Sequence, residues 1–204
     1  MSCEDARALM STALLKVGTW SAIGGLYGHA SDVRVRKTVL NRALRGVADL
    51  TFFDDFKIRF AQRVFGMWPL CRLRTADGIV KSMASFEHMH GLMKGVPSDE
   101  PLKNILWRAD SFEDMGLIWF APTVSALGRE VRRLVAIAEP LFSKHRFEMP
   151  LTVTLVTPSR VVGAFSISFS KSRPGETERA HMLYADLKAA FAQEGIGVYR
   201  SGVL

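Results

Sequence analysis

The stretch PLTVTLVTPSRVVGAFSISFS, residues 150–170, decides the fold of this chain. Apolar and polar side chains alternate over residues 150–156 and again over residues 161–170. A period of two is typical of a strand that buries one of its faces. Between the two runs, Thr157-Pro158-Ser159 has the composition of a tight turn. The pattern therefore predicts two strands paired as an antiparallel hairpin.

Further helical and extended patterns flank this hairpin. Residues 117–121 form an apolar run that predicts a buried strand, and residues 125–143 predict an amphipathic helix. A second helix is expected between the Pro174-Gly175 break and Gly195, and residues 196–199 predict a last short strand. The order strand–helix–strand–strand–helix–strand predicts an α+β fold of the ferredoxin-like (split βαβ) type, an antiparallel sheet with helices packed on one face. The side chains expected to face the sheet are Leu127, Val131, Leu134, Val135 and Ala138 in the first helix, and Leu183, Leu187, Ala190 and Phe191 in the second.

The first half of the chain has weaker patterns. Residues 4–17 predict a helix, and residues 20–27 form an apolar extended run that contains Gly24 and Gly25. A further helix is expected from the Ser31-Asp32 cap to Arg45. A strand at 51–53 and a loop at 94–98 complete the pattern, and the strand–helix–strand over residues 20–53 is expected to extend the sheet. The apolar side chains of the 31–45 helix expected to face inward are Val33, Val39, Leu40 and Leu44.

The composition is that of an ordinary globular protein, with 204 residues, 48% hydrophobic and 23% charged, so extended disorder is not expected. The net charge of +7 permits an anionic partner, but the arginine clusters contain no interleaved aromatic residues, so we expect no nucleic acid. Cys3 and Cys71 cannot form a disulfide framework, which favours a cytoplasmic location without excluding the periplasm. No segment has the length and apolarity of a membrane span, so no membrane partner is expected.

Few motifs indicate chemistry. The chain contains no phosphate-binding loop, no nucleophile elbow and no dinucleotide fingerprint. His88 and His90 lack further ligands at zinc spacing, so no metal site is expected. Tyr199 and Arg200 stand together at a strand end, where a phenol and a guanidinium can hold an anionic oxygen. Glu148 is an acid at the mouth of the 150–156 strand. For all three residues the alternative is an ordinary surface position.

Several segments together resemble the substrate (cap) domain of the vanillyl-alcohol oxidase / p-cresol methylhydroxylase family of FAD-dependent flavoproteins, the FAD-linked oxidase C-terminal domain. They occur in family order and at family-like spacing over nearly the whole chain. The segments are Trp20-Ser-Ala-Ile-Gly-Gly-Leu-Tyr-Gly28, His90-Gly-Leu-Met-Lys-Gly-Val-Pro97 followed by Trp107-Arg108, Phe120-Ala-Pro122 with Gly128, Phe147-Glu148, and Gly195-Ile-Gly-Val-Tyr199-Arg200.

This resemblance implies an FAD enzyme that oxidises para-substituted phenols at the benzylic carbon by hydride transfer to the flavin. Tyr199 and Arg200 match the family pair that stabilises the phenolate oxygen, and Glu148 matches a family acid near the flavin. No His or Tyr lies between Phe147 and Lys171, so covalent attachment of the flavin is not expected; His145 and Tyr184 lie nearby.

The resemblance further implies that residues 1–204 are one cap domain, without the N-terminal FAD-binding domain and the final C-terminal segment of the family. We therefore expect the chain to be incomplete alone and to hold FAD weakly. An FAD-binding domain on another chain, an oxygen or cytochrome c electron acceptor and a homo-oligomer are the partners that it implies. The alternative is a stand-alone ferredoxin-like module that serves binding or assembly without catalysis.

Overall fold

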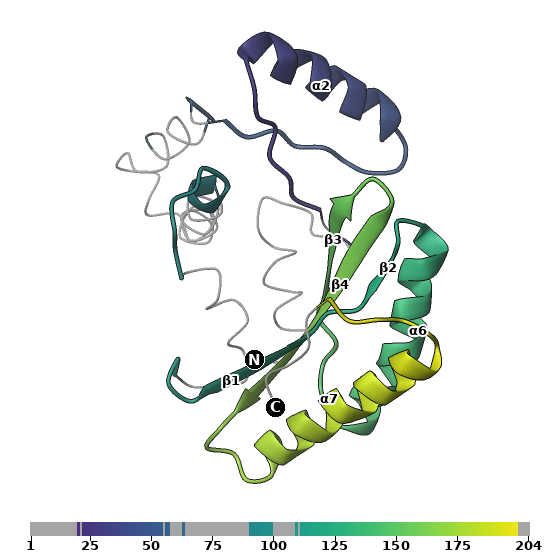
Figure 1. Cartoon of the computed structure of the whole chain (residues 1–204). Helices are drawn as coiled ribbons and strands as arrows, with labels where there is room; N and C mark the ends of the chain where they lie inside the picture. Colours follow the sequence, from purple (N-terminus) through teal and green to yellow (C-terminus); the bar gives the residue numbers. More distant parts are fainter. Residues whose placement is uncertain are drawn as a thin grey trace. The chain divides into compact units, whose positions relative to one another are not determined.

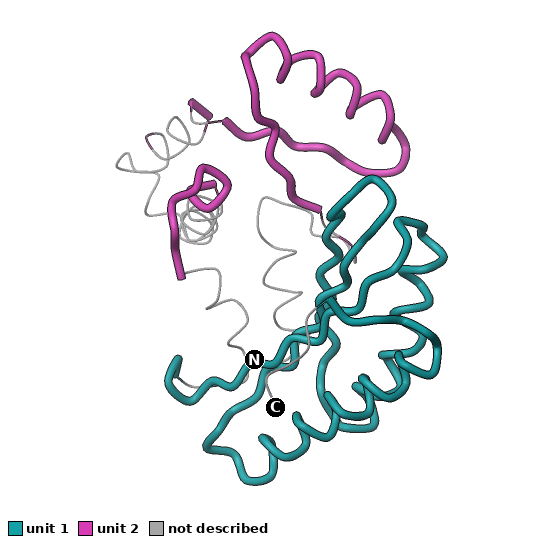
Figure 2. Tube along the Cα trace, viewed as in Figure 1, with its two compact units in different colours: residues 1–3, 102–204 teal, residues 4–101 magenta. Residues whose placement is uncertain are grey.

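The computed structural model describes residues 20, 22–54, 56–57, 63, 90–99, 109 and 111–199. The chain divides into two compact units, residues 1–3 with 102–204 and residues 4–101 (Figure 2). Each unit is described by itself below. The helix expected at 4–17, His88, the two cysteines and Arg200 lie outside the described residues.

The larger unit contains a four-stranded antiparallel sheet (Figure 1). Its strands are β1 (Met115–Phe120), β2 (Thr123–Ser125), β3 (Leu151–Thr157) and β4 (Arg160–Ser170). Strands β1 and β2 pair with β4 in one continuous register, from Met115 opposite Ser170 to Ser125 opposite Arg160, so they form two sections of a single line along one edge of β4. Strand β3 pairs with the other edge of β4 through the two-residue turn at 158–159, and the predicted hairpin is confirmed.

The C-terminal segment adds a last short pairing to this sheet. An isolated antiparallel bridge joins Val198 to Pro122. The Thr123 N–H donates to the Gly197 carbonyl at 2.9 Å, and the Tyr199 N–H donates to the Ala121 carbonyl at 2.7 Å. The spatial order is thus residues 197–199, then β1/β2, then β4, then β3. This is the predicted ferredoxin-like arrangement, and it requires no parallel pairing.

Two helices cover one face of the sheet, α6 (Gly128–Lys144) and α7 (Glu176–Gln193), as Figure 1 shows. Both contribute apolar side chains to a core in which Phe120, Phe165 and Phe191 meet, with ring centroids 5.0 to 6.4 Å apart. Edge-to-face and tilted packing of this kind is favourable for aromatic rings. The remaining buried apolar residues are Val124, Leu134, Ala138, Phe142, Phe147, Val161, Ile167, Phe169, Ala180, Leu183, Leu187 and Ile196.

The structure corrects the predicted inward positions at the ends of these elements. Leu127 is 44% exposed because it is the N-cap of α6 rather than part of its inner face. Leu155, an apolar position of the 150–156 alternation, is 65% exposed; it lies near the end of β3, next to the irregularity in the β3–β4 ladder between Leu155 and Thr157. Residues 117–121 predict a buried strand, but Trp119 is 58% exposed, because only one face of β1 is covered by helices.

The described part of the smaller unit consists of the residues before α2 (20 and 22–29), helix α2 (Ala30–Ala43) and the residues after it (44–54, 56–57, 63 and 90–99). The Tyr27 hydroxyl donates to the Met93 carbonyl at 2.6 Å, and the Lys37 ammonium lies 5.4 Å from the centroid of the Phe52 ring. The loop expected at 94–98 is present. Helix α2 begins one residue before Ser31, with His29 as its N-cap, so Ser31 and Asp32 lie in the first turn rather than capping it.

Two expectations for this unit were wrong. Residues 22–54 contain no strand, so the strand–helix–strand pattern does not extend the sheet. Val39 does not face inward but is 57% exposed, whereas Val33, Leu40 and Leu44 are half-buried. The apolar run with internal glycines gives a strand pattern without a neighbouring strand to pair with. The error at Val39 has another cause, because the periodicity of a helix shows which side chains share a face but not which face is covered. Among the described residues of the chain, no helix has the length and apolarity to cross a bilayer.

Candidate active site

The face of the sheet opposite α6 and α7 is the setting of the candidate site, and we call it the open face. Paired residues in an antiparallel sheet project to the same side, so the residues that alternate with the buried Phe120 and Phe165 belong to this face. In the middle of the sheet they are small or polar apart from Trp119 and Val162. The open-face residues are Trp119, Ala121, Thr123, Thr152, Thr154, Val162, Ala164 and Ser166.

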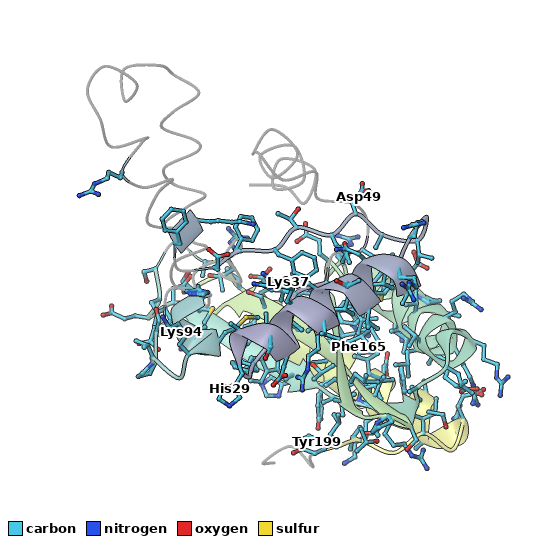
Figure 3. All side chains as sticks on the ribbon, turned by 90° about the horizontal axis from the view of Figure 1, so that it is seen from above. His29, Lys37, Asp49, Lys94, Phe165 and Tyr199 are labelled. Atoms are coloured by element: carbon cyan, nitrogen blue, oxygen red, sulfur yellow. The ribbon has the colours of Figure 1, made fainter. Side chains whose placement is uncertain are left out.

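Tyr199 projects from the open face at the edge of the sheet. Its backbone N–H is bonded to the carbonyl of Ala121, which places the two residues opposite each other and on one side of the sheet. Val198 points the other way and packs against the core. The Tyr199 side chain is 60% exposed, and Figure 3 labels it on the C-terminal segment. The phenol is therefore carried by a paired strand rather than by a loose terminus.

Trp119 and Tyr199 form an aromatic corner on the open face. Trp119 lies two residues from Ala121 along the strand, so it is the diagonal neighbour of Tyr199, at about 7–8 Å between Cα atoms. Ser166 is opposite Trp119, and the register places Ala164 opposite Ala121. Two large aromatic side chains thus lie beside a low floor, which is the flat surface formed by the small residues Ala121, Ala164 and Ser166. Trp119 was not among the residues predicted to act, because the continuous apolar run Leu117-Ile118-Trp119-Phe120 gives no signal that distinguishes it.

Glu148 lies on the same side of the sheet, in the segment that leads into β3. The Ser166 N–H donates to the Pro150 carbonyl at 3.2 Å, which continues the ladder beyond Leu151. Phe147 is buried in the core and Met149 packs against it, so the alternation directs Glu148 to the open face. Its Oε2 atom is buried and accepts no hydrogen bond from any described residue. A buried carboxylate oxygen without a donor is energetically costly.

The fold places Tyr199 and Glu148 on one face but at opposite corners. Across the sheet, Tyr199 and Glu148 are three strand-to-strand spacings apart. Along the strand direction they are four residues apart, because Thr152, which is level with Tyr199, comes four residues after Glu148. Regular strand spacing then puts their Cα atoms about 20 Å apart. A single phenol ring cannot contact both side chains. Arg200 follows Tyr199 in the sequence but lies outside the described residues.

A polar cluster lies at the end of the sheet where β1 begins and β4 ends. The Ser170 hydroxyl donates to Asp114 Oδ2 at 2.6 Å, the Ser172 N–H donates to Asp114 Oδ1 at 2.8 Å, and the Ser170 N–H donates to Glu176 Oε2 at 2.9 Å. The hydrogen bond from Ser170 is the main reason that the pKa of Asp114 lies below its ordinary value, with further bonds from Ser172. Glu176 is only 2% exposed. These hydrogen bonds join the end of β4 to the start of α7 and to the residues just before β1.

A second cluster holds the start of the segment that carries Glu148. Lys144 Nζ lies 2.7 Å and His145 Nε2 lies 2.8 Å from the same oxygen of Asp186, on α7. These hydrogen bonds, that of Lys144 first, lower the pKa of Asp186. Arg146, next in sequence, has a positive φ of 60°, which turns the chain from α6 toward β3. The cluster therefore fixes where α6 ends and the strand line begins.

The described residues fit part of an FAD molecule. A flat isoalloxazine ring would match the low floor of Ala121, Ala164 and Ser166 between the aromatic corner and the Glu148 corner, and a buried oxygen without a donor suits a ligand that supplies one. Within the described ranges, no group of three or more His, Cys, Asp or Glu side chains could hold a metal ion.

Comparisons with known proteins agree with this fold. The chain is 29% identical over 115 residues to the 4-cresol dehydrogenase (hydroxylating) flavoprotein subunit of Pseudomonas putida, which covers 56% of this chain and 21% of that protein. It also superposes on 4-ethylphenol oxidase from Gulosibacter chungangensis, solved with isoeugenol, with a TM-score of 0.63 and 16% identity, over 86% of this chain and 29% of that one. No protein-family model matches the chain.

The sequence similarity is to a flavoprotein that acts on a phenol, and the structural likeness shows the fold of a phenol oxidase. Together they support the resemblance to the vanillyl-alcohol oxidase / p-cresol methylhydroxylase family at the level of the family. The chain spans less than a third of the length of either relative. The relative from Pseudomonas putida is described by its name as one subunit, which is consistent with a partner chain.

Proposed function

We propose that this chain is the substrate domain of an FAD-dependent oxidoreductase that oxidises para-substituted phenols at the benzylic carbon, working with an FAD-binding domain on another chain. The similarity to the 4-cresol dehydrogenase flavoprotein subunit supports the class of reaction. The observation that carries the proposal is the exposed Tyr199 phenol, held by a backbone hydrogen bond on a paired strand beside Trp119. The electron acceptor is then oxygen or a cytochrome c.

Each residue has a distinct role in this proposal. The Tyr199 hydroxyl donates a hydrogen bond to the phenolate oxygen, and Arg200 adds a positive charge and a second donor. A cation and a donor in a site that excludes water stabilise the phenolate and raise the electron density at its para carbon. Trp119 covers one side of the ring and keeps water away. FAD, when bound, supplies the hydride acceptor, and Glu148, at the far corner, faces the flavin rather than the phenolate oxygen.

The test is the binding of a phenol as its anion. The purified chain is mixed with 4-ethylphenol near neutral pH, with and without FAD, and the ultraviolet difference spectrum is recorded. A phenol bound beside Tyr199 and Arg200 ionises below its ordinary pKa, so the phenolate band appears on binding. Tyr199→Phe and Arg200→Ala should each weaken this band and lower phenol affinity about tenfold or more.

Tyr184→Phe is the matched control. Tyr184 lies on α7 among the core residues, with its ring 5.8 Å from that of Phe120, so it is on the helix-covered side of the sheet. Loss of its hydroxyl should leave the phenolate band unchanged. A band of equal size in the Tyr199→Phe and Arg200→Ala proteins would contradict the proposed roles. Full benzylic oxidation by this chain alone would contradict the need for a second chain.

The alternative function is a binding or assembly module without catalysis. Trp119 and Tyr199 favour this alternative, because aromatic side chains are enriched in protein interfaces and both are exposed. If neither FAD nor 4-ethylphenol binds the chain, even in the presence of an FAD-binding domain from the same organism, this alternative replaces the first.

A further inference from the structure

Helix α2 has apolar side chains on two opposite sides. Val33, Leu40 and Leu44 are half-buried on the inner side, whereas Val35 and Val39 are 62% and 57% exposed on the outer side. No residue of α2 is buried. Valine is a weak helix former, so the intrinsic preference of the helix does not account for two valines on its exposed side.

The exposed side of α2 has the spacing of a helix–helix seam. Asp32, Val35, Val39 and Arg42 follow one another at intervals of three, four and three residues. This 3-4-3 spacing keeps side chains on one line, as in the a and d positions of a coiled coil. Asp32 and Arg42 are also exposed. The seam is therefore apolar at its centre and has one charge of each sign at its ends.

The same seam is complementary to itself when reversed. Val35 and Val39 lie equally far on either side of residue 37, and so do Asp32 and Arg42. An antiparallel copy of α2 would place Val35 against Val39 and Asp32 against Arg42, twice, around a two-fold axis. This is the isologous contact expected of a C2 dimer. A parallel copy would instead place Asp32 against Asp32 and Arg42 against Arg42, which like charges disfavour.

We infer that α2 is a dimerisation helix that pairs with α2 of a second copy of this chain in antiparallel orientation. The other basic residues of the helix do not oppose the contact. The Arg36 guanidinium donates to the Tyr27 carbonyl of its own chain at 3.3 Å, and Lys37 lies over the Phe52 ring. Helical geometry places Arg34 about 100° away from Val35, on the flank of the helix. The inference does not depend on the phenol or flavin site.

The test is a charge exchange measured by analytical ultracentrifugation of the full chain at low salt. Asp32→Arg and Arg42→Asp each turn two attractive pairs into two repulsive pairs and should each weaken the dimer about tenfold or more. The double variant restores opposite charges in reversed order and should recover the original dissociation constant within about threefold. The two single changes shift the net charge in opposite directions, so a common weakening cannot arise from net charge.

Arg34→Asp is the matched control, since it makes the same charge change as Arg42→Asp on the flank of the helix and should leave the dimer intact. Circular dichroism of every variant checks that the helices are retained. A chain that is monomeric at about 100 μM, a dimer insensitive to both single changes, or a double variant as weak as the singles would each overturn the inference. A monomer whose α2 is covered by an FAD-binding chain would be one such outcome.

A second measurement covers the case in which the charge variants do not fold. In a background with Cys3→Ser and Cys71→Ser, a Val35→Cys chain is mixed with a Val39→Cys chain under mild oxidation. Antiparallel pairing predicts that the mixture forms more disulfide-linked dimer than either chain alone. Equal yields from the mixture and from the separate chains would contradict the proposed register.

Discussion

Gly163, in the centre of β4, shows how closely the sheet and the helices approach at a single residue. A Cβ atom at this position would lie 2.8 Å from Leu134 Cδ1 on α6 and 3.3 Å from Leu151 Cδ1 on β3. Both neighbours belong to the packed layer, so neither can withdraw freely. We expect Gly163→Ala to lower the free energy of unfolding by about 1–3 kcal/mol, measured by urea denaturation.

Gly197→Ala is the control for this prediction. A Cβ at Gly197 would meet no atom within 4 Å, so the substitution should change the free energy of unfolding by no more than about 0.5 kcal/mol. If Gly163→Ala were as stable as the natural chain, α6 would have to be more loosely packed than the structure shows.

Asp186 contacts both Lys144 and His145 through one carboxylate oxygen and makes the stability depend on pH. The Lys144 and His145 hydrogen bonds lower its pKa in the folded chain below the ordinary value of 3.8. A carboxyl group with a depressed folded pKa adds stability above its unfolded pKa, and this stability is lost as the pH falls through the folded pKa. We therefore expect the free energy of unfolding to decrease as the pH is lowered below about 4.

Asp186→Asn should remove this part of the pH dependence. The effect is at most about 1 kcal/mol, because the Asp186 side chain is 36% exposed and water screens the pair. Denaturation curves of both proteins between pH 6 and pH 3 should converge at the acidic end. Asp114 contributes in the same direction in both proteins, since its pKa is also lowered, so a residual slope is expected. Parallel curves over the whole range would contradict the assignment.

At the scale of elements, Glu176 joins the end of β4 to the beginning of α7. Its Oε2 accepts the N–H of the buried Ser170 at 2.9 Å. Glu176→Ala leaves that buried donor without its acceptor and should lower the free energy of unfolding by about 1–3 kcal/mol.

Glu178→Ala is the matched variant for Glu176→Ala. Glu178 lies in the same first turn of α7 but is exposed, so its loss removes the same favourable interaction with the helix dipole without uncovering a buried donor. The difference between the two variants reports the buried hydrogen bond from Ser170 together with the 3.8 Å ion pair between Glu176 and Arg179. Equal destabilisation would mean that the helix dipole, rather than Ser170, accounts for the effect.

The sequence predicted those elements whose pattern is local and whose partner is adjacent in the chain. The β3–β4 hairpin and the buried faces of α6 and α7 follow from periods of two and 3.6 that the structure retains. The exposure of Val39 and the absence of a strand at 22–27 could not be read in the same way, because burial there depends on what lies opposite. Periodicity shows which side chains share a face but not whether that face is covered.

The candidate site was predictable to a similar extent. Tyr199 and Glu148 were selected as polar residues at strand ends, and the structure places both on the open face. Their separation depends on the number of strands between them, which requires the strand order. Trp119 was missed because an apolar run contains no information on which of its residues the helices cover.

At the scale of the whole molecule, the two units differ in how they are stabilised. The larger unit has a continuous core that includes Phe120, Phe165 and Phe191, whereas none of the described residues of the smaller unit is buried. Local stability follows buried apolar contacts. Hydrogen exchange should therefore be slower in β4 and α7 than in α2 by about 100-fold or more, as measured by mass spectrometry on a dilute, monomeric sample.

Hydrogen exchange measured at several protein concentrations also tests the proposed pairing of α2 with a second copy. If α2 pairs with a second copy, raising the protein concentration stabilises residues 30–43 by mass action and leaves β4 and α7 unchanged. Protection in α2 should then rise with concentration in the natural chain but not in Arg42→Asp. Protection that is already equal in α2 and α7 at the lowest concentration would mean that the smaller unit is stabilised within the single chain.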